Sequence, residues 1–314
     1  MSNSQIYTSS SHGWLVMLDL HPKSSKCCFL LNPVSMEKIK LPPLPKPLIS
    51  DVGFSPKYHC ILTAPPGDPK CVVVFFQSFG EHAMWCRLGG TKEPQWREQE
   101  FDRPRPFTYS VLCGTKIYCL DRKHKKLMEM SFDEDGRMEA RPLSLPGKKR
   151  IGKVPYPYPL LVRNMWFGTH YLVESQSHLY LVILFHGMED ENKIIDIWVF
   201  KLDFQSLKWT RVNDLGGHRV FFISSVNSFS CSTVNNGGSS SSSSPSSAIA
   251  IATTNANGDE CVKENTIYII LPSEVGMTAL CVYDMEEKTI TTRLVCPNVI
   301  PNITRGYWVM PMAS

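Results

Sequence analysis

The stretch HLYLVIL, residues 178–184, together with VFKLDFQSLKWTRV, residues 199–212, decides the fold of this chain. The first part is an apolar run of strand length around Tyr180, and the second is a hairpin that opens on Asp203. The same unit recurs as KIYCLD (116–121) with SFDEDGRMEARPL (131–143), and as TIYIIL (266–271) with VYDMEEKTITTRL (282–294). Tandem units of several strands are typical of radial or solenoid architectures. The repeat therefore predicts an all-β fold made of successive sheets.

The spacing of the repeated tyrosines is regular once one polar segment is set aside. Tyr118 and Tyr180 are 62 residues apart, whereas Tyr180 and Tyr268 are 88 residues apart. The longer interval contains a stretch rich in Ser, Gly and Asn, at about 233–264, with the composition of a flexible loop. Removing about 28 residues as an insertion leaves about 60, somewhat above the roughly 40 to 50 of a four-stranded propeller blade. We therefore expect a disordered insertion within the last unit.

Strand-sized runs bounded by Gly, Pro, Asn and Asp fill the rest of the chain, and helical periodicity is nearly absent. A last run, GYWVMP at 306–311, is left over after five units; such terminal strands commonly complete a blade begun at the other chain end. The prediction is one domain at 11–314, an all-β propeller of five to six mostly four-stranded blades, after a disordered tail at 1–10. A ring incompletely closed at the N-terminus is the alternative to a complete one.

The charge and cysteine content limit the classes of partner. A net charge of +4 with a pI near 8.4 is a mild excess spread along the chain, whereas a nucleic-acid-binding domain clusters its basic residues and has a pI above about 9. The N-terminus lacks a secretory signal, and the longest apolar runs fall far short of the roughly 20 residues of a membrane span. Several of the 11 cysteines lie in apolar runs, as in reducing compartments. We expect an intracellular protein, cytoplasmic or nuclear, with no nucleic-acid or membrane partner.

The residues that could carry chemistry do not form a recognisable motif. Asp133, Asp203 and Asp284 follow strands, where an Asp side chain can bond the backbone two residues on, so we interpret them as turn formers rather than acids. The run DEDG at 133–136 partly matches a calcium-binding loop and the Asp box of sialidases, but the remaining residues of each motif are missing. No zinc-ligand spacing, nucleophile elbow or phosphate loop is present. The sequence predicts no catalytic residue, no cofactor, no metal site and no enzymatic activity.

Two basic stretches are candidates for a partner-binding surface. DRKHKK at 121–126 lies between two predicted strands, and a second run leads into the proline-rich segment PYPYP at 155–159. Such runs are usually solvated loops. The alternative is a partner-binding or nuclear-import patch, because aromatic residues and Arg are over-represented among binding hot spots. The candidate partner-binding residues are Lys148, Lys149, Arg150, Tyr156 and Tyr158.

Five runs, taken in order, resemble the plant F-box-associated, kelch-like propellers of the KIB type. They are SHGWLVMLD (11–19) with CCFLLNPVSMEKIKLPPLP (27–45), CVVVFF (71–76) with WCRLGG (85–90), TYSVLCGTKIYCLD (108–121), the segment 170–232, most specific over 171–232, and VYDMEEKTI (282–290). The resemblance implies a propeller that binds proteins, often carried behind an F-box as the substrate receptor of a Skp1-cullin ubiquitin ligase. Some relatives bind and inhibit a glycogen-synthase-kinase-type enzyme.

The chain departs from this pattern at its start, where family members place an F-box and only a short segment precedes GWL. We therefore expect a non-enzymatic interaction domain that binds a protein, either a substrate or a kinase, through propeller loops. A Skp1-type adaptor is expected as a partner only if an F-box exists upstream. The alternatives are a hydrolase-like propeller enzyme with a central pocket and a kinase-binding inhibitor that acts without ubiquitination.

Overall fold

The computed structural model of this chain is all-β in the residues that it describes. Those residues are 4–9, 11–19, 27–45, 58–77, 82–89, 93–101, 107–121, 126–133, 136–144, 165–187, 193–216, 218–224, 227–232, 262–271 and 279–294. They form 21 strands and one 3-10 helix, Ser11–Gly13, with no α-helix among them. None of these residues belongs to a helix with the length and hydropathy needed to cross a membrane.

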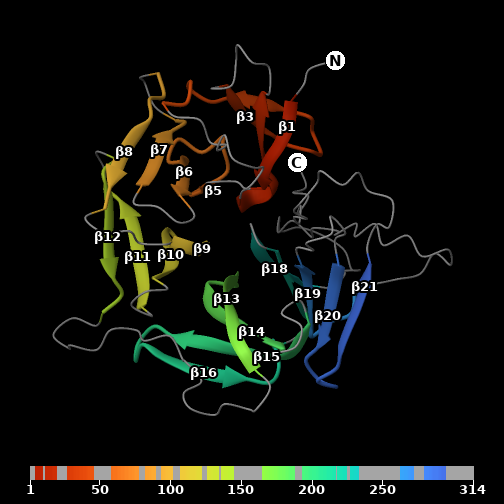
Figure 1. The fold of residues 1–314 in the computed structure, drawn as a ribbon. Helices are drawn as coiled ribbons and strands as arrows, with labels where there is room; N and C mark the ends of the chain where they lie inside the picture. Colours follow the sequence, from red (N-terminus) through yellow and green to blue (C-terminus); the bar gives the residue numbers. More distant parts are fainter. Residues whose placement is uncertain are drawn as a thin grey trace, which may run out of the picture. The chain divides into compact units, whose positions relative to one another are not determined.

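The chain divides into two compact units, residues 1–153 with 309–312 and 314, and residues 154–308 with 313. The first unit holds three antiparallel four-stranded sheets, which we call blades 1 to 3 (Figure 1). Blade 1 consists of β1 (Ser4–Ser9), β2 (Leu15–Asp19), β3 (Cys28–Leu31) and β4 (Lys38–Lys40). Blade 2 consists of β5 (Tyr58–Leu62), β6 (Val72–Gln77), β7 (His82–Arg87) and β8 (Arg97–Glu100). Blade 3 consists of β9 (Phe107–Cys113), β10 (Lys116–Asp121), β11 (Lys126–Phe132) and β12 (Met138–Pro142).

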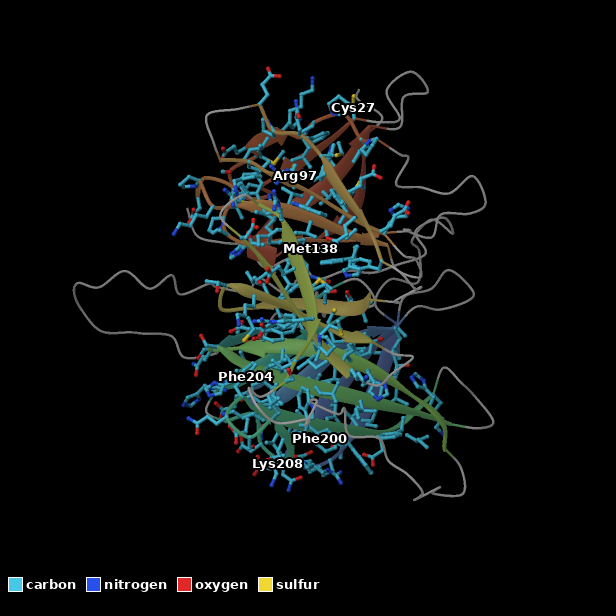
Figure 2. All side chains as sticks on the ribbon, turned by 90° about the vertical axis from the view of Figure 1, so that its left-hand side faces the viewer. Cys27, Arg97, Met138, Phe200, Phe204 and Lys208 are labelled. Atoms are coloured by element: carbon cyan, nitrogen blue, oxygen red, sulfur yellow. The ribbon has the colours of Figure 1, made fainter. Side chains whose placement is uncertain are left out.

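The second unit holds blades 4 and 5. Blade 4 consists of β13 (Met165–Ser175), β14 (His178–Gly187), β15 (Ile194–Asp203) and β16 (Lys208–Val212). Blade 5 consists of β17 (Arg219–Ile223), β18 (Ser228–Ser232), β19 (Thr266–Leu271), β20 (Ala279–Asp284) and β21 (Ile290–Leu294). Its strand order is β18-β17-β19-β20-β21, and β17 runs parallel to β19. The side chains of the described residues are drawn in Figure 2, where Phe200, Phe204 and Lys208 mark the β15–β16 hairpin.

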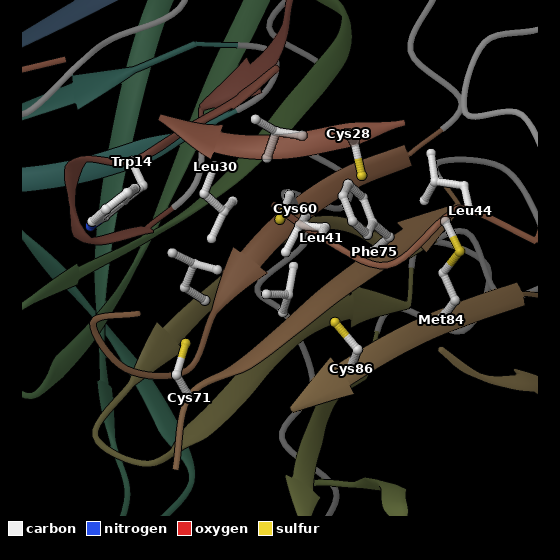
Figure 3. Packing of buried hydrophobic residues seen from close by; sticks show 13 residues of the cluster. Trp14, Cys28, Leu30, Leu41, Leu44, Cys60, Cys71, Phe75, Met84 and Cys86 are labelled. Carbon is white, nitrogen blue, oxygen red and sulfur yellow. The ribbon is translucent and has the colours of Figure 1, made fainter. Parts of the chain in front are cut away.

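The middle strands of each blade supply the core because apolar residues occupy both of their faces. All five residues from Val72 to Phe76 on β6 are buried. One face of β6 joins a cluster shared by blades 1 and 2, which includes Trp14 and Leu30 (Figure 3), and the other joins a cluster shared by blades 2 and 3. The outer strands β4, β8, β12 and β16 instead carry exposed charged residues, which discourage pairing of a sheet edge with another chain.

The predicted all-β class is confirmed, and so is the mostly four-stranded blade. The predicted disorder at 1–10 is wrong for Ser4–Ser9, which pairs antiparallel with β2 from Ser4↔Asp19 to Ser9↔Leu15. Ile6, Tyr7 and Thr8 favour a strand, but the run is short, and it takes this state by pairing with β2. The predicted GYWVMP strand and nearly all of the Ser-rich insertion lie outside the described residues.

Candidate functional site

The aspartates that recur in the sequence shape the hairpin between the last two strands of their blades. Asp203 and Asp284 each accept a hydrogen bond from the backbone N–H two residues on, at 2.9 Å in both cases. Asp133 accepts one from the N–H four residues on, at 2.7 Å. The interpretation of these residues as turn formers is thus confirmed. Asn32 has the same role in blade 1, with bonds of 2.9 and 3.2 Å, and a pattern built on Asp alone misses it.

A left-handed residue follows each of these turns. Met36, Leu207 and Lys288 stand four residues after their Asn or Asp, with φ of 59°, 51° and 56°. Leu207 is buried at 8% exposure, whereas Met36 is 63% exposed and its neighbour Val34 is 52% exposed. Val34 and Met36 are the exposed large hydrophobic residues of the described chain, and we call the pair the β3–β4 tip.

The repeated tyrosines are buried, and each hydroxyl has a different hydrogen-bond partner. Tyr118 donates to Glu129 Oε2 at 3.3 Å. Tyr180 accepts from Arg219 Nη1 at 3.0 Å, and Tyr268 accepts from a backbone N–H at 3.1 Å. A buried tyrosine stabilises a sheet only if its hydroxyl is satisfied, so these residues have a structural role.

Glu129 on β11 is a buried carboxylate held by two cations of its own blade. Its Oε1 accepts from Arg141 Nη2 at 3.1 Å and lies 3.0 Å from Lys116 Nζ. Burial, the largest single cause, raises the pKa of Glu129, but the hydrogen bonds and charges of Lys116 and Arg141 together lower it below its usual value. A carboxylate kept ionised and bonded in this way fixes β10, β11 and β12 to one another. Its interactions are those of a structural ion pair.

His59 on β5 and Ser110 on β9 form a Ser–His pair between blades 2 and 3. His59 Nε2 lies 2.9 Å from Ser110 Oγ, which is the reach of a base to a nucleophile. Burial lowers the pKa of His59 to about 4, and its ring stacks on Phe76 with 5.3 Å between centroids. A general base works best with a pKa near the operating pH, so this imidazole is a poor one. The geometry fits a hydrogen bond that joins two blades.

Four buried cysteines lie in the cluster between blades 1 and 2 (Figure 3). Burial raises the pKa of Cys28 to about 12 and that of Cys71 to about 11, and it raises the pKa of Cys60 and Cys86 as well. Thiolates, not thiols, bind metals and act as nucleophiles. Within the described part of the chain, no three Cys, His, Asp or Glu residues are arranged to hold a metal ion. These thiols act as small apolar side chains.

The predicted partner-binding residues belong to segments that the structure does not describe. Lys148, Lys149, Arg150, Tyr156 and Tyr158 all lie outside the described residues, as do residues 122–125 of the other basic stretch. Both therefore stay predictions.

Comparison with known proteins places the chain in a family. It matches the KIB1-4 beta-propeller family over residues 1–284. The curated proteins contain no match. Similar solved structures include a streptogramin B lyase (10% identity, TM-score 0.32, covering 92% of this chain and 86% of that one). A protein from Lactobacillus plantarum is 7% identical with a TM-score of 0.39, covering 92% and 69%. A catalytically inactive virginiamycin B lyase from Staphylococcus aureus, solved with quinupristin, is 9% identical with a TM-score of 0.35, covering 95% and 76%.

The structural similarities are too low to carry an argument about activity. The family match is of a different kind, because it spans most of the chain and agrees with the five blades and with the resemblance of the individual sequence runs. The chain belongs to the KIB1-4 β-propeller family, and its fold is an all-β propeller of five blades.

Proposed function

We propose that this chain is a protein-interaction propeller whose function is to bind one protein partner through its surface. The observation that carries the proposal is the family match over residues 1–284, joined to five blades. The β3–β4 tip supports it, because Val34 and Met36 expose apolar area held on a turn with four hydrogen bonds from and to Asn32. An ordered apolar contact binds with little loss of conformational entropy.

Within that function, the role that the family favours is selection of a substrate for a ubiquitin ligase. The propeller would hold the substrate while a Skp1-type adaptor connects it to the ligase through an F-box. The second candidate is inhibitory binding of a kinase without ubiquitination. We place either role in the cytoplasm or the nucleus, with no nucleic acid or membrane as the partner.

The test is a reconstitution from purified components. Crosslinking and mass spectrometry with the tagged full chain identify candidate partners, which are then purified and titrated against the chain. A 1:1 complex by light scattering is expected, weakened when Val34 and Met36 are replaced by Ser. Addition of a Skp1-type adaptor separates the two roles, because only the ligase receptor forms a ternary complex. Failure of every purified candidate to bind overturns the proposal.

The competing class is a propeller hydrolase, and the His59–Ser110 pair is the observation that would favour it. A fluorophosphonate probe reacts with activated serines. Labelling of the wild-type chain that disappears in Ser110→Ala would establish such an activity. We expect no labelling at Ser110, because His59 is a weak base.

A further inference from the structure

Trp198 on β15 is held in one orientation by its neighbours. Its Nε1–H donates to Asp196 Oδ2 at 2.6 Å, while Oδ1 of the same carboxylate accepts from Ile197 N at 2.8 Å. Phe185 on β14 packs edge-on against the indole, with 4.8 Å between ring centroids. The polar atom of the indole is thus used within the blade, and Phe185 and Phe200 both pack at a steep angle to the ring. The face of the ring remains for a further contact.

Arg211 on β16 occupies that face. Its guanidinium carbon lies 4.3 Å from the centroid of the Trp198 ring, well inside the roughly 6 Å of a cation–π contact. The two residues meet because β16 pairs with β15 in a register that sets Arg211 opposite Phe200. Arg211 is exposed, and no described carboxylate forms an ion pair with it. The guanidinium thus stacks on the ring, and the nearby carboxylate of Asp196 already accepts hydrogen bonds from Trp198 and Ile197.

The end of β16 carries charges of both signs: Asp214, whose Oδ1 accepts from Gly216 N, and the cations Arg211 and Lys288. Lys288 of blade 5 donates from Nζ to Asn213 O at 3.3 Å, which brings a second exposed cation to within two residues of Arg211 along β16. The nearby Glu287 lies 3.9 Å from Lys263, a cation of its own blade. An anionic partner at Arg211 therefore meets a second cation, Lys288, on the adjoining blade.

We propose that Arg211, seated on Trp198, is the docking point for carboxylates of an acidic segment in the protein partner; this rests on the proposed function. A guanidinium presents its N–H groups as a planar fork that matches a carboxylate with two hydrogen bonds. Stacking covers a face of the fork and leaves its edge open to solvent. Trp and Arg are the residue types most enriched among binding hot spots, and a prearranged pair loses little entropy on binding.

An acidic protein segment fits this surface better than a nucleic acid does. Nucleic acids bind through many phosphates at once and need a corresponding array of cations. The chain has a net charge of only +4 over 314 residues, and Arg211 has one neighbouring cation on its surface. One or two carboxylates are the matching ligand.

The test uses the full chain and labelled peptides in fluorescence polarisation. A hexaglutamate peptide is the probe, and hexaglutamine, a phosphoserine peptide and oligouridylate are the comparisons. We expect hexaglutamate to bind, and Arg211→Gln to weaken it about tenfold. Arg211→Lys should weaken it as well, because an ammonium lacks the planar fork. Arg137→Gln, at an exposed arginine in blade 3, is the matched control and should change nothing.

Unchanged binding in Arg211→Gln overturns the proposal, and so does tighter binding of the phosphoserine peptide or of oligouridylate than of hexaglutamate. Equal melting temperatures of the variants exclude unfolding as the cause of a loss. The same variants are then titrated with the reconstituted partner. A partner that binds Arg211→Gln as well as wild type refutes this surface and leaves the proposed function standing. If no partner binds, the proposed function fails, and the peptide titration still decides the surface.

Discussion

Glycine substitutions at the left-handed residue of two equivalent hairpins should change stability in opposite directions. Met36 and Leu207 have the same backbone conformation, with φ of 59° and 51°, at the same place in the turns of blades 1 and 4. They differ in their side chains, because Met36 is 63% exposed and Leu207 only 8%. The pair thus separates the cost of the backbone conformation from the gain of burial within one protein.

The expected magnitudes follow from those two quantities. A non-Gly residue in the left-handed region costs on the order of 1 to 3 kcal/mol, and a Gly adds about 0.5 to 1 kcal/mol of entropy to the unfolded chain. Met36→Gly should therefore stabilise the fold by about 1 kcal/mol. Leu207→Gly removes the same unfavourable backbone conformation, but it also removes a buried side chain, which costs about 2 to 5 kcal/mol of stability. Its net effect should be a loss of about 2 kcal/mol.

Urea unfolding followed by tryptophan fluorescence measures both changes, with hydrogen exchange at the two hairpins as a local reading. The local reading is needed because the chain has two compact units, and multi-unit proteins need not unfold in one step. Met36→Ala is the control, since it removes the exposed side chain but keeps the strained conformation and should gain nothing. Destabilisation by Met36→Gly, or a shift of the same sign in both glycine variants, would refute the reasoning.

Three further predictions concern the interior. Gly89→Ala should lower the free energy of unfolding in urea by about 3 kcal/mol, because the added methyl group would lie 2.2 Å from Pro69 Cα. Gly67→Ala is the control and should be neutral, because the space around Gly67 is open. Glu129→Gln should cost about 2 kcal/mol at neutral pH. Folding lowers the pKa of Glu129, so its stabilisation is present above the pKa of the unfolded chain and is lost as pH falls through the pKa of the folded chain. The melting temperatures of wild type and Glu129→Gln should therefore converge in acid. A difference that stays constant with pH would contradict this prediction. Iodoacetamide mapping at neutral pH should modify the four buried thiols between blades 1 and 2 only after unfolding: Cys28, Cys60, Cys71 and Cys86. Rapid labelling of these thiols in the folded chain would count against their burial.

The sequence identified those features whose cause is local. The turn aspartates were recognised because an Asp side chain bonds its own neighbouring backbone, and the strands because their apolar runs are long enough to be read directly. The strand at Ser4–Ser9 is not predicted because its strand-favouring residues, Ile6 to Thr8, form a run too short to be read without its partner β2. The Trp198–Arg211 stack could not be read either, since the two residues are brought together by the register of β15 with β16. Local chemistry is thus visible in the sequence, whereas contacts set by register require the structure.

The strand order of blade 5 predicts how the chain tolerates loss of its Ser-rich insertion. β17 pairs with β18 on one side, Arg219 opposite Ser232, and with β19 on the other, Val220 opposite Thr266. Ser232 and Thr266 therefore flank the same end of β17, two strand spacings or about 10 Å apart. About six extended residues can span that distance at roughly 3.3 Å each.

Replacing residues 234–260 by a Gly-Ser linker of about six residues should leave blade 5 intact. β18 keeps its own anchor, since Ser230 Oγ donates to Glu174 O at 2.9 Å. Shortening the loop to about a third lowers its closure entropy, which should stabilise the fold by about 1 kcal/mol. Thermal melts and the far-ultraviolet circular dichroism of the shortened chain check this. A lower melting temperature would mean that the insertion itself contributes contacts to blade 5, and that pairing around β17 is insufficient to hold β18 and β19.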